Sequence, residues 1–188
     1  MTARPPDTVD RPPVPRHRLL LFLAIAAVGL AADLASKHLV FARLWPPGPD
    51  HPAVIWLWTG QIGLQVSLNE GALFGIGQGL VPLFVVFSLL AGAGIVYWLF
   101  VLGEAHSLWL TVALAAIMGG ILGNLYDRLG LHGLVRPDGS RIYAVRDWIL
   151  FQWDDSLRWP NFNLADSLLV CGAVMLLLHA FLPQRNQG

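Results

Sequence analysis

Two aspartates, Asp147 and Asp166, are the residues of this chain whose type and position could support catalysis. Asp147 lies in the segment Val-Arg-Asp-Trp at 145–148, and Asp166 ends the segment Phe-Asn-Leu-Ala-Asp at 162–166. Each stands where a very apolar chain becomes polar again. An ionisable residue near membrane depth is energetically expensive, so it indicates function. Either aspartate alone could instead be a helix N-cap or a solvated loop acid.

Two neighbouring carboxylates can divide the roles of acid and base. The ionised one takes a proton from water, while the neutral one donates a proton to a scissile carbonyl. Like charges at close range separate the two titrations, so the apparent pKa values belong to the pair and neither proton is assigned from the sequence. The residue types therefore predict acid–base hydrolysis.

Metal and serine chemistry have little support, and we expect no cofactor. The six histidines include no pair at i and i+4, and the single cysteine, Cys171, cannot form a thiolate cage or an intramolecular disulfide. No Gly-x-Ser-x-Gly segment is present. Ser36 and Lys37 are adjacent, which on a helix points them about 100° apart.

The composition is that of an integral membrane protein. The chain has 188 residues, of which 55% are apolar and 13% are charged. Soluble domains carry about 25% charged residues. The mean hydropathy is +0.58. The net charge is zero, so nothing indicates nucleic-acid binding. We expect an all-α membrane protein with one small extramembrane β-sheet.

Four apolar stretches predict transmembrane helices, each needing about 20 apolar residues. They cover about 19–41, 80–102, 108–126 and 166–182, within one domain at 19–183. Residues 1–18, with five prolines and four arginines, and residues 184–188 are expected as tails. The first stretch follows two arginines and could instead be a cleaved signal peptide.

Two segments lie between the predicted helices. In 45–79, apolar residues alternate at Ile62, Leu64, Val66 and Leu68, which predicts strand structure in a sheet on the membrane surface. Segment 129–162 is expected as a loop with a turn-tipped hairpin at 136–141. Gly119 and Gly123 have the spacing of closely packed helices.

Four spans place most polar residues on one side of the membrane, whichever way the chain is inserted. The ends of helices 1 and 3 and the starts of helices 2 and 4 must share that side. The arginine distribution does not assign the side, because both the N-terminal tail and the polar side are rich in arginine. The residues that converge there are Asp33, Lys37, Asn69, Glu70, Asn124, Asp127, Arg128, Asp147, Asn163 and Asp166.

Five ordered motifs resemble those of the bacterial lipoprotein signal peptidases, the signal peptidase II family. They are Asp-Leu-Ala-Ser-Lys at 33–37, Asn-Glu-Gly-Ala-Leu-Phe at 69–74, Gly-Gly-Ile-Leu-Gly-Asn-Leu-Tyr-Asp-Arg at 119–128, and the two segments around Asp147 and Asp166. The resemblance implies a four-helix aspartic protease of the bacterial inner membrane, with its sheet and active site near the periplasmic face. Such an enzyme cleaves a prolipoprotein before its diacylglyceryl-modified cysteine.

The same resemblance implies roles for individual residues and partners. Asp147 and Asp166 correspond to the catalytic dyad. Residues that hold the substrate or support the site would be Asp33, Lys37, Asn69, Gly71, Asn124, Arg128 and Asn163. The expected partners are lipid-modified prolipoproteins and the phospholipid bilayer, and the inhibitor globomycin is expected to bind the site.

Two departures and two alternatives accompany this interpretation. Leu73 and Trp148 replace residues usual in the family, and the segment 129–146 is longer than the family usually has, which we expect to alter how the site is covered. A small transporter or proton relay would also use intramembrane acids, but its path needs polar groups on both faces. The other alternative is a non-catalytic assembly subunit that keeps the fold.

Overall fold

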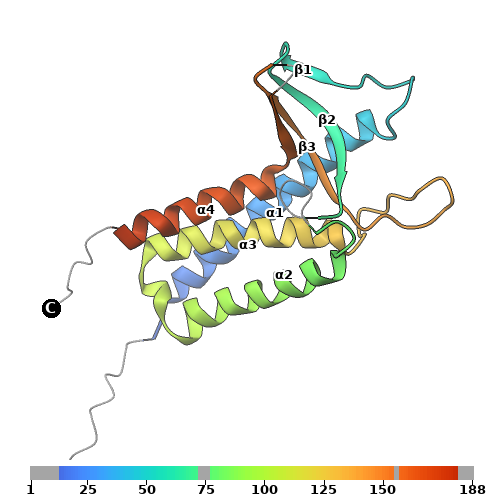
Figure 1. Cartoon of the computed structure of the whole chain (residues 1–188). Helices are drawn as coiled ribbons and strands as arrows, with labels where there is room; N and C mark the ends of the chain where they lie inside the picture. Colours follow the sequence, from blue (N-terminus) through green and yellow to red (C-terminus); the bar gives the residue numbers. More distant parts are fainter. Residues whose placement is uncertain (1–12, 72–76, 155–156, 182–188) are drawn as a thin grey trace, which may run out of the picture.

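The computed structural model describes residues 13–71, 77–154 and 157–181. A bundle of helices carries a small sheet at one end (Figure 1). Two short helical segments, η2 and η3, join α2 to α3. The elements in chain order are α1 (Arg16–Leu44), β1 (Ile55–Trp58), β2 (Ile62–Asn69), α2 (Val81–Val96), η2 (Tyr97–Val101), η3 (Glu104–His106), α3 (Leu108–Arg128), β3 (Val145–Gln152), β4 (Arg158–Phe162) and α4 (Leu164–Phe181).

Within the described residues, four helices are long and apolar enough to cross a membrane, as the sequence predicted: α1, α3, α4 and the continuous α2–η2 segment Val81–Val101. Helix α1 has 29 residues. At 1.5 Å per residue it is roughly 44 Å long, so it exceeds the ~30 Å hydrocarbon core of a bilayer. It extends past the bundle toward the sheet (Figure 1). Its start at Arg16 corrects the predicted tail 1–18, whose residues 1–12 lie outside the described chain.

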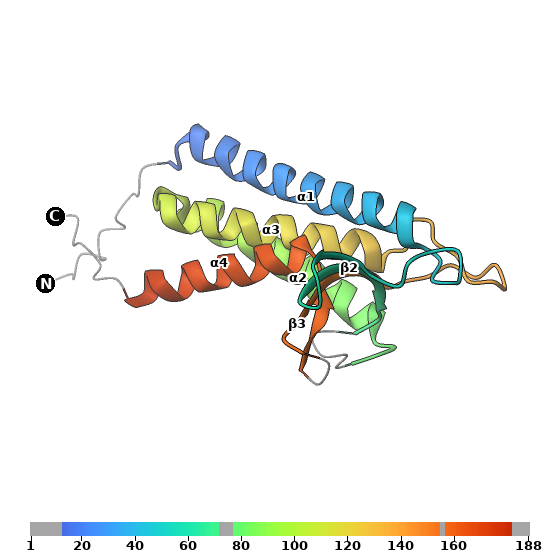
Figure 2. The same ribbon diagram turned by 90° about the horizontal axis from the view of Figure 1, so that it is seen from above.

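Helix α3 occupies the centre of the bundle, between α1 and α4 (Figure 2). Its glycines allow this packing. A Cβ atom added at Gly119 would lie 3.4 Å from the Cα atom of Gly29 on α1, and one at Gly120 would lie 2.9 Å from Cγ of Leu169 on α4. The close packing predicted for Gly119 is confirmed, and α1 is an integral part of the bundle.

The outer surfaces of the bundle are apolar. Large hydrophobic side chains are more than one third exposed along α1, α2 and α4, including Leu20, Val28, Leu90, Val170 and Phe181. Such a surface suits contact with lipid tails. The helix backbone also needs no water there, because a helix satisfies its backbone polar groups internally.

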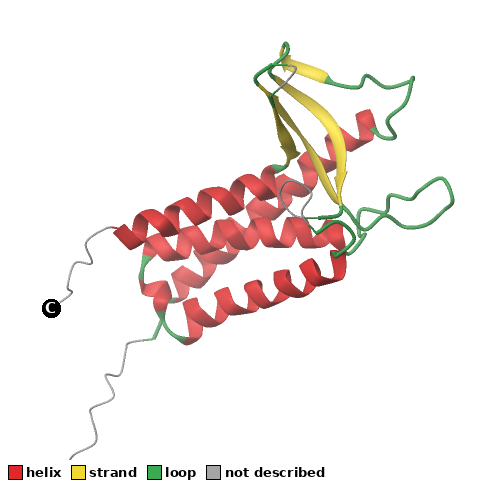
Figure 3. Cartoon of the chain, in the orientation of Figure 1, coloured by secondary structure: helices red, strands yellow, loops and turns green. Residues whose placement is uncertain are grey.

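The sheet is antiparallel, with strand order β1-β2-β3-β4 (Figure 3). The strand predicted from alternation at 62–68 is confirmed as β2. Ser67 pairs with Asp147, and Asn69 pairs with Val145. The register therefore places the end of β2 beside the start of β3, where Asp147 lies.

Segment 129–162, expected as a loop, contains strands β3 and β4. The prediction was wrong because β3 begins with Val145, Arg146 and Asp147, all three of which are buried. An alternating pattern requires one exposed face, which this part of the strand lacks. The expected hairpin is present: Arg136 N–H donates to Ser140 O at 2.8 Å, and Val135 pairs with Arg141.

Candidate active site

Asp147 lies near the start of β3 with only 2% of its surface exposed. Its Oδ1 accepts a hydrogen bond from Asn163 Nδ2 at 2.6 Å, and its Oδ2 accepts one from Asn69 Nδ2 at 3.2 Å. Burial raises the pKa of Asp147 to about 7, and the charge of Asp166 acts in the same direction. The two asparagine bonds and the charge of Lys37 lower that pKa, but burial outweighs them.

Asp166 lies in the first turn of α4 and forms a capping box with Asn163. Asn163 is the N-cap residue: its Oδ1 accepts from the Asp166 N–H at 2.9 Å, and its own N–H donates to Asp166 Oδ2 at 3.2 Å. The other carboxylate oxygen, Oδ1, accepts from Asn124 Nδ2 at 2.8 Å. Asp166 thus supports the start of α4 from its third position, not as the N-cap residue of the simpler interpretation, and it is part of a polar cluster.

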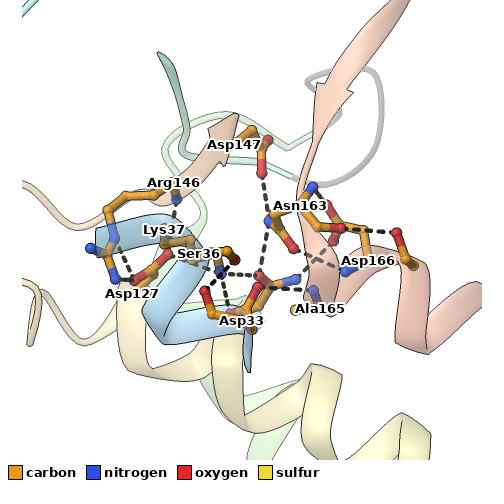
Figure 4. Close-up of polar contacts among 11 residues, drawn as sticks. Asp33, Ser36, Lys37, Asp127, Arg146, Asp147, Asn163, Ala165 and Asp166 are labelled. Carbon is orange, nitrogen blue, oxygen red and sulfur yellow. Dashed lines mark hydrogen bonds and ion pairs between the residues drawn. The ribbon is translucent and has the colours of Figure 1, made fainter. Parts of the chain in front are cut away.

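Asn163 joins the two aspartates. It is fully buried, and it binds Asp147 through its side-chain amide and Asp166 through its backbone N–H. Its Nδ2 also donates to Asn124 Oδ1 at 3.2 Å. Figure 4 shows Asn163 between the two carboxylates. A single rigid residue therefore fixes the position of one carboxylate relative to the other.

A cavity of about 900 Å³ opens onto both carboxylates. Its lining mixes apolar and polar side chains. Ile121, Leu169 and Val170 give an apolar wall on α3 and α4, whereas the part beside the sheet combines the polar residues Gln65, Arg158 and Asn161 with apolar ones, Val66, Trp159 and Pro160. Of the nine predicted site residues, six line the cavity: Asn69, Gly71, Asn124, Arg128, Asp147 and Asp166.

Arg128 connects the end of α3 to the segment after β2. Its Nη2 donates to Gly71 O at 3.1 Å, and its guanidinium lies 5.1 Å from the ring centroid of Phe84 on α2. Its Nε is buried and has no hydrogen-bond partner among the described residues. The arginine therefore joins the end of α3 to the segment after β2 at the cavity wall.

Three predicted residues do not line the cavity. One is Asn163, which joins the aspartates, and the other two, Asp33 and Lys37, lie behind the cavity. Lys37 Nζ is 2.7 Å from Asp33 Oδ2 and donates to Asn124 Oδ1 at 3.0 Å. Two further charged residues belong to this layer, Asp127 and Arg146 (Figure 4). Neither was predicted as a site residue, although each stands next to one that was. Adjacency to Arg128 and Asp147 was the available signal.

The fold and the site together define a class: multi-pass membrane proteins that hold two aspartates around a cavity at one end of a four-helix bundle. The family model described as signal peptidase (SPase) II matches residues 25–182. The chain belongs to the signal peptidase II family. The resemblance that rested on five motifs is thereby confirmed.

Relatives and solved structures agree with this assignment. The lipoprotein signal peptidase of Rhodopirellula baltica is 46% identical over 167 residues, which are 89% of this chain and 74% of that protein. The lipoprotein signal peptidase of Pseudomonas aeruginosa is 39% identical, over 93% of this chain and 96% of its own length. A solved bacterial membrane enzyme has the same fold, with a TM-score of 0.70 at 21% identity over 90% of this chain and 93% of that one.

Proposed function

We propose that this protein is an aspartic endopeptidase that removes the signal peptide from diacylglyceryl-modified prolipoproteins, cleaving before the lipidated cysteine. The observation that carries the proposal is the arrangement of Asp147 and Asp166, joined by Asn163 at the edge of one cavity. Family membership supports the peptidase activity. The relatives named as lipoprotein signal peptidases support the substrate class.

The electrostatics favour Asp147 as the acid and Asp166 as the base. With a pKa of about 7, Asp147 holds a proton in much of the population at neutral pH. In the first step Asp166 takes a proton from water, the water oxygen bonds to the scissile carbonyl carbon, and Asp147 donates its proton to the carbonyl oxygen. A tetrahedral diol results, and the charge has moved from Asp166 to Asp147.

Collapse of the diol restores both groups. One hydroxyl proton returns to Asp147, the carbonyl forms again, and the C–N bond breaks. Asp166 gives its proton to the departing amine, so the signal peptide leaves with a new carboxyl terminus and the lipidated cysteine gains a free amino group. Asn163 holds both carboxylates throughout, which limits the reorganisation that the reaction requires.

The polarity of the cavity suggests how a substrate lies in it. The part lined by Ile121, Leu169 and Val170 suits the apolar signal peptide and the acyl chains. The part beside the sheet, with Gln65, Arg158 and Asn161, suits the polar chain after the cysteine. We further propose the bacterial inner membrane as the location, a periplasmic orientation of the sheet and site, and binding of globomycin in this cavity.

The transporter or proton-relay alternative gains no support from these comparisons. The matching family is a peptidase family, and the two relatives described above are both lipoprotein signal peptidases. The assembly-subunit alternative requires that the aspartates be dispensable, which a direct experiment decides.

The test is cleavage of a diacylglyceryl-modified prolipoprotein by the purified protein in detergent. We expect wild type to release the signal peptide, and Asp147→Asn and Asp166→Asn to lose more than about 10³-fold in rate while remaining folded. Asp50→Asn is a matched control, because Asp50 is an exposed aspartate outside the cavity. Cleavage by either aspartate variant at the wild-type rate would disprove the proposed mechanism.

A further inference from the structure

Four charged side chains are buried together behind the dyad. Asp33, Lys37 and Asp127 are fully buried and Arg146 is 5% exposed. Lys37 Nζ lies between two carboxylates, 2.7 Å from Asp33 Oδ2 and 3.1 Å from Asp127 Oδ2. Arg146 binds Asp127 Oδ1 through Nη2 at 2.8 Å and Nε at 3.0 Å. The cluster contains two positive and two negative groups, so its charges balance.

Stability alone does not explain such a cluster. Burying ion pairs costs desolvation energy that their attraction repays only with good geometry, and apolar side chains of similar volume often serve stability as well or better. Asp33 also requires a special neighbour: a Cβ atom at Gly123 of α3 would collide with its carboxylate. Because stability does not explain why α1 and α3 accommodate this cluster, we infer that it has a role besides stability.

Each carboxylate of the cluster also accepts a hydrogen bond from one backbone N–H group. Asp33 Oδ1 accepts from the Ala165 N–H at 2.9 Å, and Asp127 Oδ2 accepts from the Arg146 N–H at 2.9 Å. Ala165 directly precedes Asp166, and Arg146 directly precedes Asp147. The same arrangement thus occurs twice, once on α4 and once on β3 (Figure 4).

We propose that Asp33 and Asp127, joined by Lys37, are positioning residues that set the spacing of Asp147 and Asp166. Asp33 fixes the first turn of α4, and Asp127 fixes the start of β3. Lys37 binds both carboxylates and so ties these two anchors to one point on α1.

Lys37 adds a third connection to the dyad. Its ammonium group donates to Asn124 Oδ1 at 3.0 Å. Because an ammonium group only donates, it requires the oxygen of that amide on its own side. The Asn124 Nδ2 group is then free to donate to Asp166 Oδ1 at 2.8 Å. Lys37 therefore determines which atom of Asn124 faces the aspartate.

This inference rests on the proposed function, and it predicts a specific kinetic effect. Asp33, Lys37 and Asp127 do not line the cavity. Their loss should leave substrate binding unchanged and lower the rate of the chemical step, because misplacement of reacting groups by about 1 Å can cost about 10²-fold in rate.

The test compares two charge-balanced double variants, because Lys37→Met alone would leave an unpaired buried carboxylate. Asp33→Asn with Lys37→Met keeps an oxygen that accepts from the Ala165 N–H but lacks the ion-pair link. Asp33→Leu with Lys37→Met lacks both. Thr111→Val is the control: Thr111 is fully buried, and its hydroxyl donates to Ser107 O at 2.8 Å near the start of α3.

We expect both double variants to keep KM within about twofold, with kcat about 10-fold lower for the first and about 100-fold lower for the second. Thr111→Val should lose thermal stability without losing kcat. If Asp33→Leu with Lys37→Met folds and keeps the wild-type kcat, the proposal is overturned. A rise in KM that accounts for the whole loss of kcat/KM would also overturn it.

Amide hydrogen exchange of the wild-type protein, followed by NMR in detergent, tests the geometry without any activity. The first N–H groups of a helix have no partner within it. Slow exchange at Ala165, at the second position of α4, therefore reports its bond to Asp33. We expect the amides of Ala165 and Arg146 to be protected from exchange. Fast exchange of the Ala165 amide in the wild-type protein overturns the proposal, even if neither double variant folds. If wild type cleaves no lipidated substrate, the proposed function fails and the exchange result still decides the positioning claim.

Discussion

At the scale of single residues, the environment of Asp147 determines its chemistry. Its hydrogen bonds from Asn69 and Asn163 stabilise the carboxylate, yet burial and the charge of Asp166 dominate and raise its pKa to about 7. The aspartates and asparagines could be predicted from the sequence, because their types and motifs are visible there. The division of roles that we propose for the two acids could not, because it rests on the burial of Asp147 by the fold.

The raised pKa of Asp147 has a consequence for stability. A carboxyl group whose pKa rises on folding favours the folded state most at pH values below its unfolded pKa of about 3.8, and that contribution is lost as pH rises through about 7. Asp147→Asn removes the titration. We expect the Tm of this variant to exceed that of wild type by on the order of a few degrees at pH 8, and the difference to shrink toward pH 5.

Thermal unfolding in detergent across pH 5 to pH 8.5 measures this difference. Asp50→Asn, which changes an exposed aspartate, should follow the wild-type curve. An Asp147→Asn protein less stable than wild type at pH 8 would contradict the raised pKa.

Asn163 has a structural role at the start of α4 and, in the proposed mechanism, a positioning role beside Asp147, and one pair of variants can separate the two. Serine is a good N-cap residue, so Asn163→Ser should preserve the start of α4 while losing the amide bond to Asp147. Asn163→Ala should lose both, with about 1 kcal/mol less stability than the serine variant. We expect both to lower kcat by roughly 10²-fold, because each frees Asp147 from its partner.

Cleavage kinetics and urea unfolding of the two variants provide the measurements. The interpretation of Asn163 as the connecting residue fails if Asn163→Ser retains wild-type kcat.

At the scale of elements, contacts between helices decide where the dyad lies. The start of α4 is held against α3, where a Cβ atom at Gly120 would lie 2.5 Å from Ala165 O and 2.9 Å from Leu169 Cγ. Helices and strand β2 could be predicted from hydropathy and alternation. Strand β3 could not, because Arg146 and Asp147 are polar residues whose burial depends on partners from α1, α3 and α4.

Gly120→Ala therefore tests the contact between α3 and α4. The added methyl group must displace the backbone of α4, so we expect the free energy of unfolding to fall by roughly 1–3 kcal/mol. We also expect the residue just before Asp166 to shift, which lowers kcat. Gly94→Ala on α2 is the matched control, since a Cβ atom there meets nothing within 4 Å. Alanine is the better helix former, so the control should be neutral or more stable by up to about 1 kcal/mol.

Thermal unfolding and cleavage rates in detergent compare the two glycine variants. Equal stability of Gly120→Ala and wild type would show that α4 can move away from α3 without cost.

At the scale of the whole molecule, the site exists only because distant segments meet at one end of the bundle. Residues from α1, β2, α3, β3 and α4 contribute to one hydrogen-bonded network. The parity of four spans predicted this convergence from the sequence, because alternate connections must share a side. The contacts themselves could not be predicted, since side-chain geometry depends on how the helices pack.

The hairpin 136–141 projects beyond the end of α3, away from the sheet tip (Figures 1 and 2). Its described contact toward the site is the ion pair of Arg136 Nη2 with Glu70 Oε1 at 2.9 Å, and both side chains are more than one third exposed. Glu70 directly follows Asn69, which binds Asp147. The hairpin thus connects to the wall of the cavity through one solvent-exposed interaction.

Replacing residues 136–141 by Asn-Gly should therefore affect substrate binding more than chemistry. Exposed ion pairs contribute about 0.2–1 kcal/mol, which corresponds to at most about fivefold in KM. We expect kcat to stay at the wild-type value and KM to rise within that range, with the effect reproduced by Glu70→Gln and weakened by high salt. A replacement that leaves KM and substrate range unchanged would show that the hairpin does not cover the site, while a loss of kcat would show that it reaches the dyad.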